Sequence, residues 1–210
     1  MNQIKVLNSI YASFIETIVT YPIDYIKTNN QVSKKIIFTF NNSYNGIKYR
    51  FIGILPMRFI FWNTMDYCRK NDYNRLNSSF LISFNQTLID YPMEQVKTQV
   101  MVNKKNNIYE CFKQKNLIMC YNTTLIRNFK FMYIFKCIQD NKLINNDFIN
   151  NGIGGLTASI LTHPIDTLKT YYQSNTKINF YKINYMNGVF YRSSIGFLSM
   201  SIGYYFFHYF

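Results

Sequence analysis

Three acidic residues in this sequence are each followed, three positions later, by a lysine, a spacing that suits the formation of ion pairs. They lie in three similar segments, which read YPIDYIKT at 21–28, YPMEQVKT at 91–98 and HPIDTLKT at 163–170. On a helix, residues three apart are neighbours on one face, so each segment would present its acid and its lysine together. An unpaired ion inside a helical bundle in lipid costs at least about 2.5 to 3.5 kcal/mol. Three acids and three lysines inside such a bundle are therefore expected to pair with one another.

The three segments mark an internal repeat. Their prolines, Pro22, Pro92 and Pro164, recur at intervals of about 70 residues, which is typical of a structural unit repeated along a chain. A proline inside a helix removes one backbone hydrogen bond and kinks the helix, so we expect three kinked helices. Small residues spaced four apart let helices pack closely in lipid. Such residues stand nine and five positions before each proline: Ser13 and Thr17, Ser83 and Thr87, Gly155 and Ser159.

Each repeat contains two apolar stretches, one that leads into the motif and one that closes the repeat after a polar segment. A membrane-spanning helix needs about 20 mostly apolar residues, which is the length of these stretches. The predicted fold class is all-α, a membrane protein with six transmembrane helices in a threefold pseudosymmetric bundle. The expected helices cover about 4–29, 50–70, 78–101, 117–138, 152–174 and 190–210. They form a single domain, 1–210, with repeats over about 1–75, 76–145 and 146–210.

Composition narrows the classes of function. Lys and Arg number 23 against 10 acidic residues, and this net charge of +13 points to an anionic partner such as phospholipid, nucleic acid or a metabolite. A mean hydropathy of −0.13 fits a basic soluble helical protein as well as a membrane protein. Glu16 interrupts the first apolar stretch, so we expect no signal peptide. The sequence shows no metal-ligand spacing, no nucleophile with its base and no glycine-rich phosphate loop, so we expect neither an enzyme nor a metal or other cofactor.

Further matches between repeats lie downstream of the motifs. The first and third repeats contain NGIKYR at 45–50 and NGVFYR at 187–192, whereas the second has LIMCYN at the matching place. Three Px[DE]xxK motifs with this block resemble the mitochondrial carrier family, whose signature is Px[DE]xx[KR] followed by [DE]Gxxxx[YWF][KR]G. The resemblance covers essentially the whole chain. It departs from the signature where asparagine precedes the glycine and where Phe51 and Ser193 replace the glycine after YR.

The resemblance implies a gate on the matrix side of a central cavity. Its ion pairs would join Asp24 to Lys97, Glu94 to Lys169 and Asp166 to Lys27, with Gln31 and Gln173 bracing two of them. An exposed, partly hydrated ion pair is worth only about 0 to 1 kcal/mol, so substrate binding can offset the opening of such a gate. On the cytoplasmic side there are only loose candidates for a second gate: Asp66 with Arg69, Asp72 with Arg75, and Asp140 with Lys142.

The resemblance also places substrate contacts on the even-numbered helices. They fall at Arg58, at Arg127 and Asn128 with Lys130 nearby, and near Ser199 or Met200. An Arg-Asn pair resembles carriers of keto acids and other carboxylates, although the planar guanidinium suits phosphate equally well. The glycine block is expected either to hold cardiolipin phosphates or to anchor the chain at the membrane interface. Its residues are Gly46, Tyr49, Arg50, Gly188, Tyr191 and Arg192.

The predicted function is that of a secondary carrier of the mitochondrial inner membrane, a monomer that moves a small anionic metabolite by alternating access, as in antiport. The metabolite would be a carboxylate or keto acid, or a nucleotide or phosphate. Two alternatives stay open. One is a degenerate carrier-like bundle that does not transport. The other is a basic helical protein that binds nucleic acid, although its Lys and Arg residues are scattered among apolar helices rather than gathered on one polar face.

Overall fold

The computed structural model of the chain describes residues 3–32, 44, 47–103, 111–112, 117–174 and 183–209. These residues contain no strand, so the described part of the chain is all-α, as the sequence predicts. Each of the six expected helices has a counterpart. Their bounds are α1 Gln3–Gln31, α3 Ile47–Lys70, α4 Arg75–Asn103, α6 Leu117–Asn141, α7 Asp147–Ser174 and α8 Val189–Tyr209.

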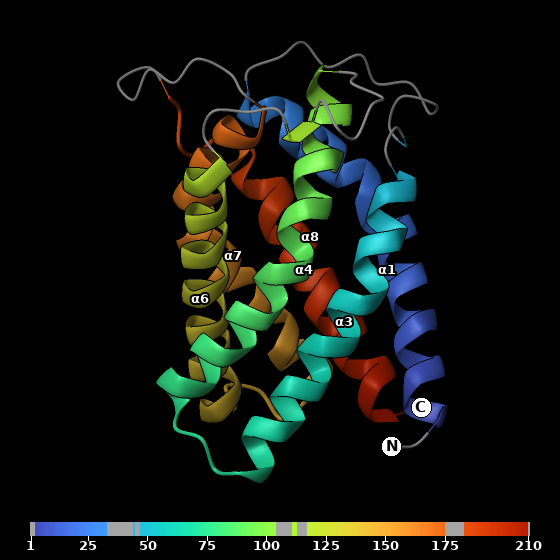
Figure 1. The fold of residues 1–210 in the computed structure, drawn as a ribbon. Helices are drawn as coiled ribbons and strands as arrows, with labels where there is room; N and C mark the ends of the chain where they lie inside the picture. Colours follow the sequence, from blue (N-terminus) through green and yellow to red (C-terminus); the bar gives the residue numbers. More distant parts are fainter. Residues whose placement is uncertain are drawn as a thin grey trace.

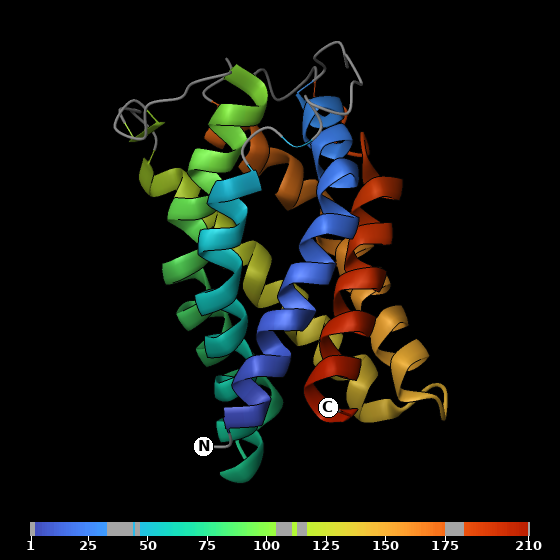
Figure 2. The ribbon, with the colours of Figure 1, turned by 90° about the vertical axis from the view of Figure 1, so that its right-hand side faces the viewer.

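The six helices form a closed ring. Each packs against the next along the chain, and α8 returns to pack against α1. Figure 1 shows the helices running along one long axis, and Figure 2 shows both chain termini at the same end of the bundle. The turns at 71–74 and 142–146 lie at that end too, which we call the termini end. The C-terminal parts of α1, α4 and α7, which carry the three motifs, point to the opposite end, the motif end.

Two helices begin several residues before the expected positions because asparagines cap them. The side-chain oxygen of Asn146 accepts hydrogen bonds from the backbone nitrogens of Phe148 at 3.0 Å and Ile149 at 3.3 Å. The Asn74 side chain does the same for the backbone nitrogen of Asn77 at 3.3 Å. Asparagine is among the best residues at a helix N-cap because it satisfies one of the unpaired backbone donors there. Polar residues that resemble loop sequence are thus the first turns of α4 and α7.

The prolines of the three motifs lie inside α1, α4 and α7, and a fourth proline, Pro56, lies inside α3. Figure 1 shows α1 bending as it passes from the termini end towards the motif end. Small residues bring α7 and α8 together at the level of their backbones. A side-chain carbon added at Gly155 would clash with the carbonyl oxygen of Gly196, and one added at Gly196 would clash with Ser159. The close helix approach predicted from Gly155 and Ser159 is therefore present.

The bundle has a polar interior and an apolar exterior. Among the described residues, buried polar and charged side chains outnumber buried apolar ones. Helix α4 shows the pattern clearly. Its outer face carries, at every fourth position, Leu76, Phe80, Phe84 and Leu88, which are 41 to 56% exposed. Its inner face carries the buried Ser79, Ser83 and Thr87. Water-soluble proteins show the reverse distribution, because burial of apolar side chains drives their folding.

Measured by average hydropathy over a membrane-length window, none of the helices in the described part of the chain is apolar enough to count as a membrane-crossing segment.

Candidate functional site

The acids and lysines of the three motifs meet inside the bundle at the motif end. The contacts join Lys27 Nζ to Asp166 Oδ2 at 2.5 Å, Lys97 Nζ to Asp24 Oδ2 at 2.5 Å, and Lys169 to Glu94. They link α1 to α7, α4 to α1 and α7 to α4, so the three motif helices are tied in a closed triangle. The pairing between helices is the one expected from the resemblance.

The ion pairs of the triangle are shielded from solvent to different degrees. The side chains of Lys27 and Asp166 are 6% and 0% exposed, whereas that of Asp24 is 17% exposed. A buried ion pair stabilises little in itself, but removing one partner leaves an uncompensated charge, which costs several kcal/mol. The Lys27–Asp166 pair is therefore the one whose disruption should cost most.

The two expected brace residues have different surroundings. Gln31 contacts an ion pair directly, because its side-chain nitrogen donates to Asp166 Oδ2 at 3.1 Å and its oxygen accepts from Thr170 at 2.7 Å. Gln173 instead lies against α4, where its side-chain oxygen accepts a hydrogen bond from Thr98 at 3.2 Å. Gln31 thus supports the Lys27–Asp166 pair, whereas Gln173 joins α7 to α4 beside the Glu94–Lys169 pair.

Arg127 forms a second layer of charge directly below the triangle. Its guanidinium lies 3.1 Å from Asp166, 3.4 Å from Glu94 and 3.4 Å from Asp90, so one arginine of α6 bridges carboxylates of α4 and α7. Asn128 accepts from the Nε of Arg127 at 3.0 Å. Both expected contact residues are buried and face the interior, with their hydrogen bonds made to the protein itself.

A third cluster joins α3, α1 and α8. Arg58 forms an ion pair with Glu16 and a hydrogen bond with Ser199, and the Ser199 hydroxyl donates to Glu16 Oε1 at 2.7 Å. The guanidinium carbon also lies 5.9 Å from the centre of the Phe61 ring, within the range of a cation–π contact. The first and third expected substrate positions, Arg58 and Ser199, are therefore in direct contact.

The arginines of the two glycine blocks turn inward. Arg50 lies 3.6 Å from Asp90, and Arg192 lies 4.0 Å from Asp166. This differs from the expected role of these arginines at lipid phosphates, because each guanidinium lies within ion-pair distance of a buried carboxylate instead. Gly188 adopts a left-handed backbone with φ of 82° and packs against the Lys27 carbonyl.

Of the other expected lipid-binding residues, the structure describes the side chain of Tyr191. The side chain of Tyr191 is partly exposed and lies edge-on to Phe190, with ring centres 6.0 Å apart. Gly46 and the side chain of Tyr49 lie outside the described residues.

Lys130 is the clear exception among the expected contact residues. It is exposed on the outer side of α6 and does not line the central cavity. The inner face of α6 runs through Arg127, Asn128 and Phe131, which all line that cavity, and this register turns Lys130 outward. The structure therefore places Lys130 apart from the other expected substrate contacts.

A central cavity of about 80 Å³ lies among these clusters. Its charged lining consists of four arginines and three carboxylates, namely Arg50, Arg58, Arg127, Arg192, Glu16, Asp90 and Glu94. Glu16 and Asp90 were not predicted as site residues, although a carboxylate within an otherwise apolar segment is itself a signal of function in a membrane protein. The excess of guanidinium groups makes the cavity suited to an anion.

The candidates for a second gate at the termini end pair differently from expectation. Arg75 lies 2.9 Å from Asp140 rather than contacting Asp72, because the chain reverses at Asp72 with a φ of 50°. Neither Asp66 with Arg69 nor Asp140 with Lys142 forms an ion pair in the described part of the chain. A wider cavity of about 530 Å³, which we call the vestibule, opens between these turns.

No group of residues suited to a metal ion occurs among the described residues, and the four cysteines are free thiols. In sequence comparisons, no protein-family model matches this chain. No curated protein matches it either.

Proposed function

We propose that this chain is a membrane carrier of small anions, which works by alternating access through the axis of its helical ring. The observation that carries the proposal is the inverted distribution of polarity, with charges buried along the axis and apolar side chains outside. Lipid favours this distribution, since the bilayer solvates the apolar faces while charged groups must pair inside. The six helices would then be transmembrane, in a threefold pseudosymmetric bundle.

The three ion pairs are proposed to be the gate. They lie on the motif end of the central cavity, while the vestibule lies towards the termini end, so the arrangement fits a carrier closed at one end and accessible from the other. Opening the motif end requires all three pairs to separate. A bound anion can offset that cost by replacing the carboxylates as partners of the arginines, which bind carboxylate and phosphate oxygens through the same planar fork.

The proposed substrate is a small carboxylate or phosphate, because four arginines face three carboxylates in the central cavity. The mitochondrial inner membrane, a monomeric state and binding of cardiolipin are proposed on the resemblance of the three motifs to the carrier family. Of the glycine blocks, Gly188 and Tyr191 stay candidates for lipid contact, while Arg50 and Arg192 are assigned to the central charge network.

One observation favours a second candidate function, that of a bundle that does not transport. The arginines of the central cavity are already bound to the protein's own carboxylates, and the cavity is small, at about 80 Å³. A purely structural network of this kind would hold the helices together without admitting a solute. The two candidates differ in one measurable property, which is uptake.

The deciding experiment is reconstitution of the purified chain into liposomes, with uptake of labelled phosphate, succinate and ADP measured in separate assays. We expect saturable uptake of at least one anion, and a decrease of at least about tenfold for Arg58→Gln, since a charge-assisted hydrogen bond is lost. A chain that stays in the membrane after alkaline carbonate treatment but takes up none of the anions would be the structural bundle. Release by carbonate or high salt would instead favour the nucleic-acid binder.

A further inference from the structure

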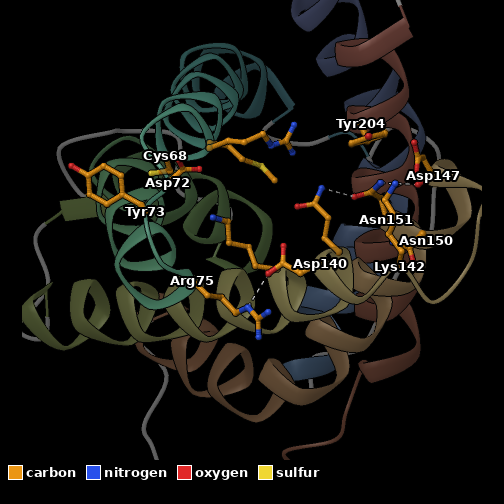
Figure 3. Close-up of a pocket in the computed structure, with 14 residues that line it drawn as sticks. Cys68, Asp72, Tyr73, Arg75, Asp140, Lys142, Asp147, Asn150, Asn151 and Tyr204 are labelled. Atoms are coloured by element: carbon orange, nitrogen blue, oxygen red, sulfur yellow. Dashed lines mark hydrogen bonds and ion pairs between the residues drawn. The ribbon is translucent and has the colours of Figure 1, made fainter.

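The vestibule at the termini end is a cavity distinct from the central one. It has a volume of about 530 Å³ and lies among the ends of α3, α4, α6 and α7, with Tyr204 of α8 also on its wall. Figure 3 shows Cys68 and Tyr73 on one side of this pocket and Asn150 and Asn151 on the other. None of the arginines that line the central cavity lines the vestibule.

Three of the four cations that line the vestibule form no ion pair among the described residues, and one of the three, Lys142, is exposed in the turn after α6. Arg69 of α3 and Lys136 of α6 both line the cavity, and neither lies within ion-pair distance of a carboxylate among the described residues. The Lys136 ammonium donates to the Ser78 hydroxyl at 2.5 Å, which satisfies one of its three donor positions. Both cations therefore keep donors that a ligand can use.

The carboxylates of the vestibule do not offset this excess. Four cations and three carboxylates line it, and Asp140 is bound to Arg75 at 2.9 Å, as Figure 3 shows. Asp147 lies in the first turn of α7, where the helix dipole stabilises its negative charge, and Asp72 is exposed in the turn after α3. Walls of low dielectric constant strengthen the field of the remaining cations, and Met65 and Cys68 supply such a wall beside them.

Amide groups supply neutral donors on the opposite side. Gln139 donates to the side-chain oxygen of Asn151 at 3.2 Å, which fixes both amides across the gap between α6 and α7. Asn150 is buried and also lines the vestibule, and its side-chain oxygen accepts from the backbone nitrogen of Ile144 at 3.4 Å. Guanidinium, ammonium and amide donors thus surround one cavity.

We propose that the vestibule is a second anion-binding site, at which Arg69 and Lys136 bind the carboxylate or phosphate group of a small soluble solute. Its use as a first docking position for a transported anion rests on the proposed carrier function. The binding itself does not, because it requires only the cavity and its two cations.

The test is equilibrium binding of radiolabelled inorganic phosphate and succinate to the full chain in detergent. The background is Arg58→Gln, which weakens the central site. On that background we expect saturable binding, and a loss of at least about tenfold for Arg69→Gln and for Lys136→Gln, since each removes one charge-assisted interaction. Lys70→Gln is the matched control, because it removes the same charge next to Arg69 from an exposed side chain outside the vestibule. It should bind as the background does.

Arg69→Lys and Lys136→Arg should restore much of the binding, which separates ligand contact from a folding defect. The inference is overturned if the Arg58→Gln background binds neither anion, or if the vestibule variants bind as Lys70→Gln does. It is also overturned if phosphatidate-containing nanodiscs displace the soluble anions, since the site would then belong to a lipid headgroup. Binding without liposome uptake would sustain the vestibule site and refute the carrier function, whereas uptake unaffected by the vestibule variants would refute only the role of the vestibule as a docking position.

Discussion

Lys27 near the C-terminal end of α1 lies 2.5 Å from Asp166 of α7, so the first and third motifs of the sequence meet in the folded chain. Asp166 is fully buried and also lies 3.1 Å from Arg127. One carboxylate therefore joins the layer of motif lysines to the layer of cavity arginines. Any movement that separates α1 from α7 at the motif end must also change the surroundings of Arg127, and this coupling is what a gate linked to substrate binding requires.

Asp166→Asn should be the most destabilising of the neutralising substitutions. It leaves Lys27 and Arg127 without a common partner inside the bundle, and breaking a buried ion pair costs about 3 to 5 kcal/mol. Thermal unfolding in detergent measures the effect, with loss of helical signal as the readout. Asp140→Asn is the matched control, because it removes an exposed carboxylate from the pair with Arg75 and should leave the unfolding temperature nearly unchanged. Equal unfolding temperatures for the two variants would contradict the assigned burial.

The Asp24–Lys97 pair allows the gate to be separated from simple stability. Lys97→Met and Asp24→Leu should each destabilise the chain, while the double variant should recover most of the loss, since an apolar pair of similar size replaces the ions. We expect a coupling energy of about 1 to 3 kcal/mol from the double-mutant cycle. Uptake into liposomes should stay impaired in the double variant, because the apolar pair cannot open and re-form as ions do. Normal uptake would count against the gate.

Helix positions could be predicted because they depend on local pattern, whereas the pairing of each motif acid with a lysine of another motif was implied by the resemblance to the carrier family. Apolar stretches of suitable length predict the helices, and a regular repeat brings equivalent residues such as Asp24 and Asp166 to equivalent places in a closed ring. The caps at Asn74 and Asn146 were not predicted, because asparagine is equally common in loops and at helix starts. The first residues of α4 and α7 are therefore known only from the folded chain, in which the two asparagine side chains accept hydrogen bonds from backbone nitrogens.

Side-chain direction in the second, fourth and sixth helices of the chain, which are α3, α6 and α8, could not be predicted reliably. The Arg127-to-Lys130 segment carries cations on two sides of α6, and only packing against α4 and α7 decides which one faces inward. Arg50 and Arg192 likewise belong to sequence blocks that suit an interface, yet they pair with the buried carboxylates of Asp90 and Asp166. Ion pairs of this kind join residues that are far apart in the chain, so no repeating pattern in the sequence predicts them.

Arg127→Lys should show how far the central network depends on a guanidinium. A lysine keeps the charge but offers one ammonium where Arg127 reaches three carboxylates, so it cannot replace the planar fork. We expect a fall of at least about tenfold in liposome uptake, together with a lower unfolding temperature. Lys130→Gln on the same helix should leave both quantities at wild-type values, because its side chain is exposed. Loss of uptake in Lys130→Gln would restore the role predicted from the sequence.

Gly196→Ala tests the backbone contact between α7 and α8. The added methyl group would meet the Gly155 carbonyl and the Ser159 side chain, and the backbone atom cannot move aside without separating the helices. Overpacking of this kind typically costs about 1 to 3 kcal/mol. Gly154→Ala is the matched control, since its methyl group would meet the Phe135 ring at 3.1 Å, a side chain that can shift, and alanine favours a helix over glycine by about 1 kcal/mol. Thermal unfolding in detergent should therefore show a clear loss for Gly196→Ala and little change or a gain for Gly154→Ala, whereas equal losses would mean that the two helices do not touch through their backbones.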